Sequence, residues 1–330
     1  MPPVSNVVAG MPAAADPRRG ALTLWHAAAV GHRAPLCAVA LLCAVVLAWN
    51  TRAGVVFTGW PTFVIGTAVL VGVAVFFSSA MRRPSIAELA FTVALWNALN
   101  IGGGIMSYLA AAAAAPLVDA ALVRFDEAIG FDWVAWVGFV RSHGALNAVL
   151  RAAYISLPLQ LYGSILLFSV ARVPGRNEEM LLLGCASVLL TCVTAVWLPA
   201  LGPWVHFGLG GLVPADTAYV AHVVALRQEH APSFALHQMQ GIVTFPSFHT
   251  TLALLFTYAH RGIPWSFPPV ALLNGAMLLS IPSEGGHYLA DMLAGAFVAL
   301  ASIAAARAAR RRFGPWSGAA GPENSVESAA

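Results

Sequence analysis

Long apolar runs recur along almost the whole chain. A transmembrane helix needs about 20 mostly apolar residues to cross a hydrocarbon core of about 30 Å. Eight segments approach this description: 35–50, 57–80, 86–109, 149–171, 180–200, 248–260, 267–281 and 288–306. Only 9% of the residues are charged, whereas an ordinary soluble domain has about 25%. The sequence therefore predicts an all-α, polytopic membrane helix bundle.

The arginine distribution predicts how the helices are oriented. The first and sixth segments are short, so seven spans stay open as an alternative that would reverse one end of the protein. With eight spans and both termini in the cytoplasm, twelve of the seventeen basic residues lie on the inner side, as the positive-inside rule expects. The closing run Arg310–Arg312 anchors the last helix there. We therefore expect a bacterial inner-membrane protein whose outer face meets the periplasm.

Four regions are expected along the chain. They are a cytoplasmic tail without regular structure (1–34), the first membrane helices with an outer interfacial segment (35–147), a second membrane domain (148–306) and a basic cytoplasmic tail (307–330). Two outer segments, 110–148 and 201–246, exceed ordinary connections, and long loops often carry function. In the first, Trp133 and Trp136 beside Asp126 predict a helix in the membrane interface, where aromatic rings prefer to lie.

Composition excludes some classes of function. All seventeen basic residues are Arg and none is Lys; they are too dilute to follow a nucleic-acid backbone, so nucleic acid is not an expected partner. The four cysteines lack the CxxC spacing of zinc or redox sites and are interpreted as small core residues. These are Cys37, Cys43, Cys185 and Cys192.

Ionisable side chains at membrane depth are costly and mark candidate functional sites. His287 and Asp291 open the eighth segment, four residues apart. On a helix this spacing lets the carboxylate reach the imidazole, support its charged form and leave the other ring nitrogen free to attack an electrophile. Ser247 is a predicted N-cap at the start of the sixth segment, where free N–H groups can bind an anion, and His249 follows it. The pattern predicts one histidine as nucleophile and the other as acid around a bound phosphate.

These two segments resemble the motifs of a known family. The run from Pro246 to His249 resembles the PSxH signature of the type 2 phosphatidic acid phosphatase (PAP2) superfamily. The run from His287 to Gly295 resembles the HYxxDxxxG signature of its branch related to inositol phosphorylceramide synthase. The resemblance covers about 148–306 and implies PAP2-like core helices in the C-terminal half. It implies that His287 forms a phosphohistidine, Asp291 orients it, His249 protonates the leaving group and Ser247 binds phosphate.

The chain departs from the family where the phosphate charge has to be met. The first signature contains a Lys, which this chain lacks, and Ser283 and Glu284 lie where many phosphatases place an Arg before the nucleophile. A phosphate monoester carries close to two negative charges, and helix ends supply only partial ones. We therefore expect an Arg in the site, first Arg151 and second Arg227, although snorkelling to lipid headgroups explains Arg151 equally well.

The resemblance implies a phosphatase or phosphotransferase, with hydrolysis favoured, that acts on a lipid phosphate at the periplasmic face and needs no metal or other cofactor. Transfer of an inositol-phosphate-type headgroup to a lipid acceptor is the nearest alternative. Two others keep the histidines: a zinc hydrolase with His249, His287 and Asp291 as ligands, and a transporter with a His287–Asp291 proton relay. The bilayer and a lipid phosphate are the expected partners. The particular lipid, the phosphoryl acceptor and the oligomeric state stay open.

Overall fold

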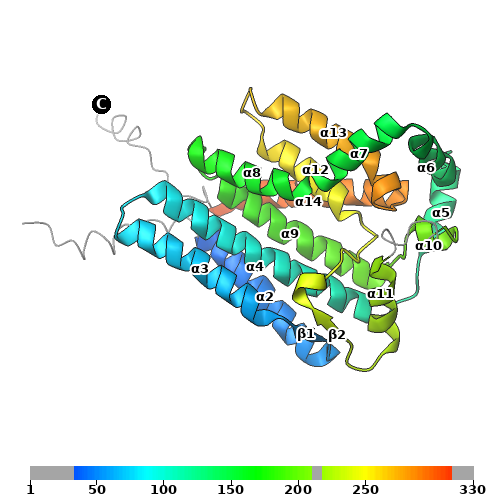
Figure 1. The fold of residues 1–330 in the computed structure, drawn as a ribbon, viewed down its shortest axis with the longest axis horizontal. Coiled ribbons are helices and arrows are strands. Elements are labelled where there is room, and N and C mark those ends of the chain that lie inside the picture. Colours follow the sequence, from blue (N-terminus) through cyan, green and yellow to red (C-terminus); the bar gives the residue numbers. More distant parts are fainter. Residues whose placement is uncertain (1–32, 210–217, 314–330) are drawn as a thin grey trace, which may run out of the picture.

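The computed structural model describes residues 33–209 and 218–313, and most of this part of the chain is helical (Figure 1). The expected N-terminal tail up to residue 32 and the chain from residue 314 on lie outside it. The elements up to the middle of the chain are α2 (Arg33–Ala53), β1 (Val56–Thr58), α3 (Trp60–Ser79), α4 (Pro84–Ala112), α5 (Asp119–Ala128), α6 (Trp133–Ser142), α7 (Gly144–Ile155) and α8 (Leu157–Val170). The later elements are α9 (Arg176–Trp197), α10 (Pro203–His206), α11 (Ala218–Gln228), β2 (Ser233–Ala235), the 3-10 turn η3 (Leu236–Gln238), α12 (Phe248–Ala259), α13 (Phe267–Glu284) and α14 (Leu289–Phe313).

Within the described residues, five helices are long and apolar enough to cross a membrane, namely α2, α3, α4, α9 and α14. Helices α7 and α8 meet at a bend of 51° and add a sixth crossing if they form one broken span. Helix α12 has 12 residues and therefore rises only about 18 Å. Helix α13 has 18 residues but is not apolar enough to join this set. The described part of the chain therefore holds five or six helices that are long and apolar enough to span a membrane, fewer than the eight expected. The protein is an integral membrane helix bundle, as predicted.

Local sequence explains where several helices begin. Proline occupies the first or second position of α3, α4, α8 and α13, where its fixed φ suits a helix and its missing N–H has no intrahelical acceptor to lose. Ser156 ends α7 immediately before Leu157-Pro158 opens α8. Pro158 has no N–H to donate to the carbonyl of Tyr154, and its ring crowds that carbonyl, which accounts for the break in the predicted fourth span.

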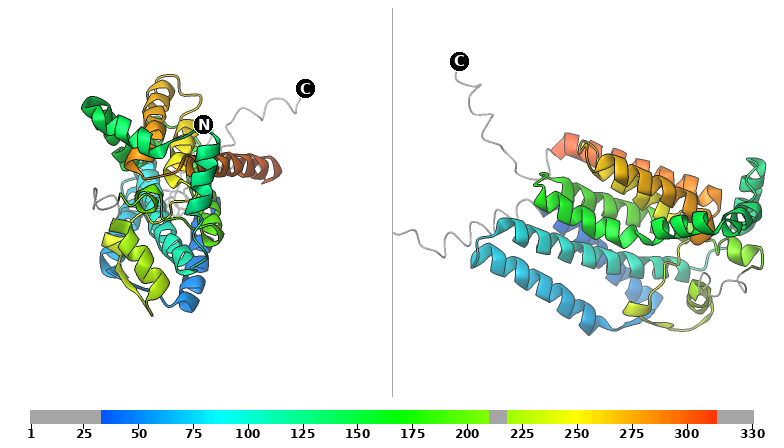
Figure 2. Two further views of the ribbon diagram at one scale, coloured as in Figure 1. Left: turned by 90° about the vertical axis from the view of Figure 1, so that its right-hand side faces the viewer. Right: turned by 45° about the horizontal axis from the view of Figure 1, so that its top comes forward.

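Helix α9 lies between two groups of helices (Figure 2). It packs against α2 and α4 on one side and against α12 and α14 on the other. The largest apolar cluster joins these groups around α4, α8, α9 and α12, with Leu99, Phe168, Leu181 and Phe256 almost completely buried. The C-terminal helices thus share one core with the N-terminal ones.

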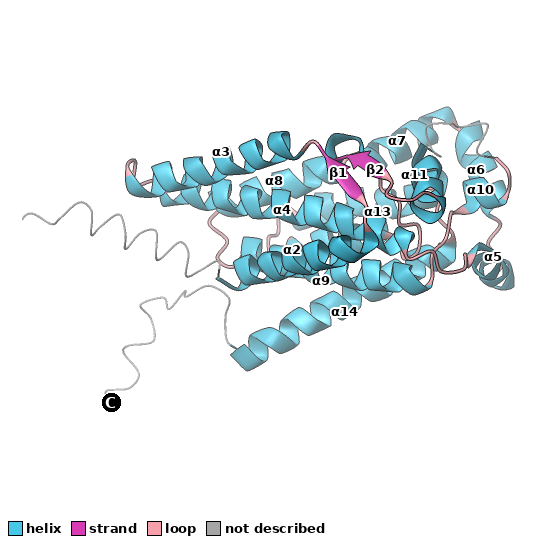
Figure 3. Ribbon diagram, turned by 90° about the horizontal axis from the view of Figure 1, so that it is seen from below, coloured by secondary structure: helices cyan, strands magenta, loops and turns pink. Residues whose placement is uncertain are grey.

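Short elements gather at one end of the bundle, on the right-hand side in Figure 1. Strands β1 and β2 pair in parallel there, with Val56 opposite Ser233, and lie near α11 (Figure 3). The segment expected to hold one interfacial helix forms α5 and α6 instead. Trp133 is 2% exposed; its ring packs with Val137 and Trp204, and its indole N–H donates to the carbonyl of Pro282 at 2.9 Å. This ring therefore packs inside the protein and does not lie in the membrane interface.

Candidate active site

The predicted contact between His287 and Asp291 is present, although its local geometry differs from the one expected. His287 precedes α14 in a loop, and its Nδ1 lies 3.2 Å from Oδ2 of Asp291 in the first turn of that helix. The same Oδ2 accepts the backbone N–H of Tyr288 at 2.9 Å. The carboxylate thus folds back over the helix start, as in a capping box. A helical i,i+4 pairing does not describe it.

Both members of the pair are buried, with His287 5% and Asp291 0% exposed. Burial lowers the pKa of His287 to about 4, against the opposing effect of a hydrogen bond to the backbone of Thr244. The imidazole is therefore neutral at pH 7 and carries a lone pair on one ring nitrogen. A nucleophilic histidine needs this state before it attacks.

Ser247 caps α12 and does not line the cavity described below. Its hydroxyl accepts the backbone N–H of Thr250 at 3.3 Å and the Thr250 hydroxyl at 3.2 Å, and the side chain is fully buried. Its own N–H donates to the carbonyl of Asp291 at 3.0 Å. The N-cap prediction is confirmed, and this residue ties the start of α12 to the helix that carries Asp291.

Helices α12 and α14 approach each other closely at Gly295. A Cβ at this position would collide with the carbonyl oxygen of Ser247 and lie 3.1 Å from Cβ of Thr250. The hydroxyl of Thr251 donates to the carbonyl of Gly295 at 2.9 Å. The glycine at the end of the HYxxDxxxG pattern therefore lets the two motif-bearing helices touch, which brings their N-terminal ends together.

His249 and His287 line one cavity of about 510 Å³. Its wall continues past Tyr154, Glu284 and Gly285 to Asn100, Ser107, Thr191 and Gln240. The ring of Tyr154 stacks on His249, and a Cβ on Gly285 would lie 3.1 Å from Cε2 of the same tyrosine and 2.8 Å from Cδ2 of His287. The structure thus brings the two predicted histidines to a common cavity, whose wall is more apolar than polar and carries neutral hydrogen-bonding groups beside Glu284.

The predicted arginines lie outside this lining. Arg151 is exposed on α7, three residues before Tyr154. Arg227 on α11 donates to the carbonyls of Ala114 and Ala115 at 3.4 and 2.8 Å, where the chain leaves α4 with carbonyls that no helix satisfies. Both contacts use Nη2, and Arg227 is not among the residues that line the cavity. Among the described residues, no Arg lines the wall that His249 and His287 share.

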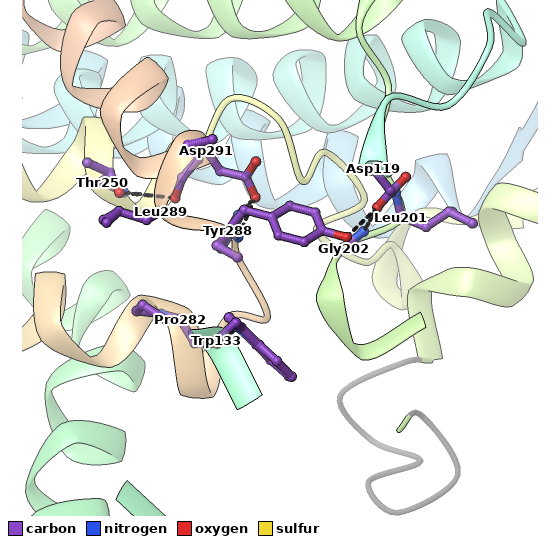
Figure 4. Close-up of polar contacts among 12 residues, drawn as sticks. Asp119, Trp133, Leu201, Gly202, Thr250, Pro282, Tyr288, Leu289 and Asp291 are labelled. Carbon is purple, nitrogen blue, oxygen red and sulfur yellow. Dashed lines mark hydrogen bonds and ion pairs between the residues drawn. The ribbon is translucent and has the colours of Figure 1, made fainter. Parts of the chain in front are cut away.

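Two carboxylates of α5 lie against the loop that carries His287; the sequence analysis placed Asp126 in an interfacial helix and did not single out Asp119. Asp119 accepts the Tyr288 hydroxyl at 3.0 Å (Figure 4). Asp126 accepts the backbone N–H groups of Leu289 and Ala290 at 2.7 and 2.8 Å. Both aspartates are on α5, seven residues apart and therefore on one helical face. That spacing was a signal in the sequence, but it did not identify the distant partners.

The predicted zinc ligands do not form a metal site. In residues 33–209 and 218–313, no group of three or more His, Cys, Asp or Glu side chains has an arrangement that could hold a metal ion. His249 stacks on the ring of Tyr154, and the carboxylate of Asp291 accepts the N–H of Tyr288, just before α14 begins. The donor geometry therefore gives the zinc alternative no support.

These features define an all-α integral membrane protein with a His–Asp pair and a second histidine at one cavity. The family model described as the PAP2 superfamily matches residues 120–305, more than half of the chain, and the chain belongs to this superfamily. Its members are phosphatases or phosphotransferases, so the chain is an enzyme of this general kind, with an activity of the lipid-phosphate type. No curated protein and no solved structure matches significantly in the corresponding comparisons.

Proposed function

We propose that this protein is a lipid phosphatase or phosphotransferase that works through a phosphohistidine on His287, at the periplasmic end of the bundle. The carrying observation is that His249 and His287, from two different motif segments, line one cavity. A nucleophile and an acid must both reach the same phosphorus centre for such a reaction. The common cavity meets this requirement.

In the first step, Nε2 of His287 attacks phosphorus and the bond from phosphorus to the leaving oxygen breaks. The negative charge of the bound phosphate favours the protonated form of His249, and this imidazolium gives its proton to that oxygen, so the lipid alcohol leaves and His249 becomes neutral. Asp291 holds Nδ1 and offsets the positive charge that develops on the ring. In the second step, water or another alcohol attacks the phosphohistidine, gives a proton to His249 and restores free His287.

The start of α12 offers donors for the phosphate oxygens. The hydroxyl of Ser247 accepts the N–H of Thr250, whereas the N–H groups of Phe248 and His249 have no acceptor within the described part of the chain. Both residues line the cavity. Unpaired N–H groups at a helix N-terminus bind anions well. Ser247 then acts on the phosphate by holding these donors in place.

Arg151 remains the proposed cation. It lies three residues before Tyr154 on α7, and residues at this spacing share a helical face. Because Tyr154 lines the cavity, the exposed guanidinium belongs to the face of α7 that leads to the cavity. A long, mobile side chain in this position can meet a phosphate as it enters.

Transfer to an alcohol is the second candidate function, and the size and lining of the cavity favour it. The wall extends from the histidines to Asn100, Ser107 and Gln240, which provides neutral hydrogen-bonding groups beyond the phosphate position. Water alone needs no such extension, whereas a hydroxylated acceptor or headgroup does. An inositol-phosphate-type transfer is therefore included in the proposal beside hydrolysis.

The experiment is a phosphate-release and transfer assay on detergent-purified protein. The substrates are phosphatidic acid, a prenyl diphosphate and phosphatidylglycerol phosphate, each alone and with a ceramide or inositol-bearing partner. We expect His287→Asn to abolish product formation and acid-labile labelling of the protein by ³²P-lipid, while its helical content stays that of the wild type. Undiminished turnover by a folded His287→Asn variant would reject the assignment.

A further inference from the structure

The start of α14 is held by a carboxylate from another part of the chain. Asp126 of α5 accepts the N–H of Leu289 through Oδ2 at 2.7 Å and the N–H of Ala290 through Oδ1 at 2.8 Å. These are the first two residues of α14, and their N–H groups have no intrahelical acceptor. Asp126 is 3% exposed. A buried, bidentate carboxylate of this kind fixes the position of the helix end it binds.

Asp291 follows these two residues directly, so its position depends on theirs. Its carboxylate closes the helix start by accepting the N–H of Tyr288 and contacts Nδ1 of His287. A shift of the first turn of α14 would therefore move the carboxylate away from the imidazole. Asp126 does not line the cavity that His287 lines. Its direct route to the reaction runs through the first turn of α14, and therefore through Asp291.

A second carboxylate of α5 binds Tyr288, which follows His287 in the same loop. Asp119 accepts the Tyr288 hydroxyl at 3.0 Å and the backbone N–H groups of Leu201 and Gly202, the latter at 2.8 Å (Figure 4). Tyr288 is 1% exposed. Helix α5 thus binds the loop at two places, one carboxylate on the side chain of Tyr288 and one on the backbone that follows it.

Trp204 limits the loop from another side. Gly286 has a φ of +59°, and a Cβ there would lie 2.7 Å from Nε1 of Trp204. That indole packs edge-on against Trp133, with ring centroids 4.8 Å apart. The backbone before His287 therefore lies against a rigid aromatic wall, while the backbone after it is bound by Asp126.

We propose that Asp126 is a positioning residue for the nucleophile: through the first turn of α14, it holds the Asp291 carboxylate against the imidazole of His287. This inference rests on the proposed function, because it requires His287 to attack phosphorus. Asp119 supports the same loop through Tyr288. The buried face of α5 that carries Asp119 and Asp126 then supports the active site, although neither residue lines the cavity of the two histidines.

The test variant is Asp126→Asn. An amide keeps the size of the side chain, but its NH2 group cannot accept a hydrogen bond, so one of the two N–H groups loses its partner. Because a misplacement of about 1 Å can cost roughly 100-fold in rate, we expect kcat to fall by about this factor while KM stays within about threefold. The matched control is Glu127→Gln, a neighbouring acid-to-amide change at an exposed residue, which should leave both constants unchanged.

A double-mutant cycle with Asp291→Asn separates positioning from general stability. If Asp126 acts through Asp291, Asp126→Asn should lower kcat by less than about threefold in the Asp291→Asn background. The same factor in both backgrounds would show a merely structural contribution and overturn the inference. If Asp126→Asn fails to fold, Asp126→Glu takes its place in the cycle, with the same expected non-additivity. Thermal unfolding and helical content are measured for every variant.

The failures of the two proposals are distinguishable. A His287→Asn variant that keeps its turnover overturns the proposed function and this inference with it. An inactive His287→Asn variant beside a fully active Asp126→Asn variant overturns only the positioning role. Three results together support the positioning role: a lower kcat in Asp126→Asn, an unchanged KM, and non-additivity with Asp291→Asn.

Discussion

The ring of Tyr154 stacks on the imidazole of His249, with centroids 4.3 Å apart and 14° between the planes. Tyr154 lies in the last turn of α7, just before the 51° break into α8, whereas His249 lies in the first turn of α12. The break therefore ends α7 where its tyrosine can cover the imidazole. This contact restricts the ring orientation of the proposed general acid.

Removal of His249 should have an effect that depends on the leaving group. General acid catalysis contributes about 10²–10⁴-fold, but only where the departing oxygen needs a proton. We expect His249→Gln to lower kcat/KM by at least about 100-fold for a lipid phosphate whose leaving group is an alcohol. The loss should be much smaller for 4-nitrophenyl phosphate, whose leaving group departs as an anion. Equal losses for both substrates, measured side by side, would contradict the acid role.

Acid pH should destabilise the protein through His287. The pKa of this group is lowered to about 4 by burial in the folded state, while an unfolded chain has a histidine pKa of about 6.5. The unfolded state therefore binds more protons between these values, and the stability contribution falls as the pH drops from about 6.5 to about 4, by at most about 3 kcal/mol.

Thermal unfolding of detergent-solubilised protein between pH 7.5 and pH 4 measures this effect. On acidification, the melting temperature of the wild type should fall further than that of His287→Gln, because the variant has no titrating imidazole at that position. Parallel curves for the two proteins would show that the burial of His287 does not control the acid response.

Gly295→Ala should separate α12 from α14. The added Cβ would collide with the carbonyl of Ser247, and overpacking of this kind costs about 1–3 kcal/mol. We expect a lower melting temperature together with reduced kcat, because the two helix starts carry His249 and Asp291. Gly163→Ala on α8 is the matched control, since its Cβ would meet nothing within 4 Å. A Gly295→Ala variant as stable and active as this control would disprove the close approach.

Arg151→Gln tests the proposed cation. If the guanidinium meets the phosphate as it enters, KM for a lipid phosphate should rise by about tenfold, corresponding to the loss of about 1.4 kcal/mol of binding, with a smaller change in kcat. The rise should shrink at high salt, which screens an exposed charge. Arg124→Gln, at an exposed position on α5, is the control. Matching KM values for the two variants would remove Arg151 from the site.

Patterns along the chain predicted the features that depend on neighbouring residues. The apolar runs predicted a membrane helix bundle because a bilayer requires every spanning backbone to satisfy its own hydrogen bonds. Ser247 was predicted as a helix cap because a cap is made within four residues. The contact of His287 with Asp291 was also predicted from the spacing of the two residues. A continuous helix was expected to carry both, but His287 lies in the loop before α14 and Asp291 lies in the first turn of that helix.

Tertiary structure decided everything that joins distant segments. Asp126 and Ala290 are separated by more than 160 residues, and no periodicity in either segment reveals that one supplies the hydrogen-bond acceptor for the other. The sequence also could not predict that Arg227 donates to a carbonyl after α4 or that Trp133 is buried. Charge and aromaticity indicate what kind of partner a side chain prefers, but not which group in the fold becomes that partner. The sequence by itself determined the chemistry that was present. Only the packing of α5, α12 and α14 determined which of these groups meet.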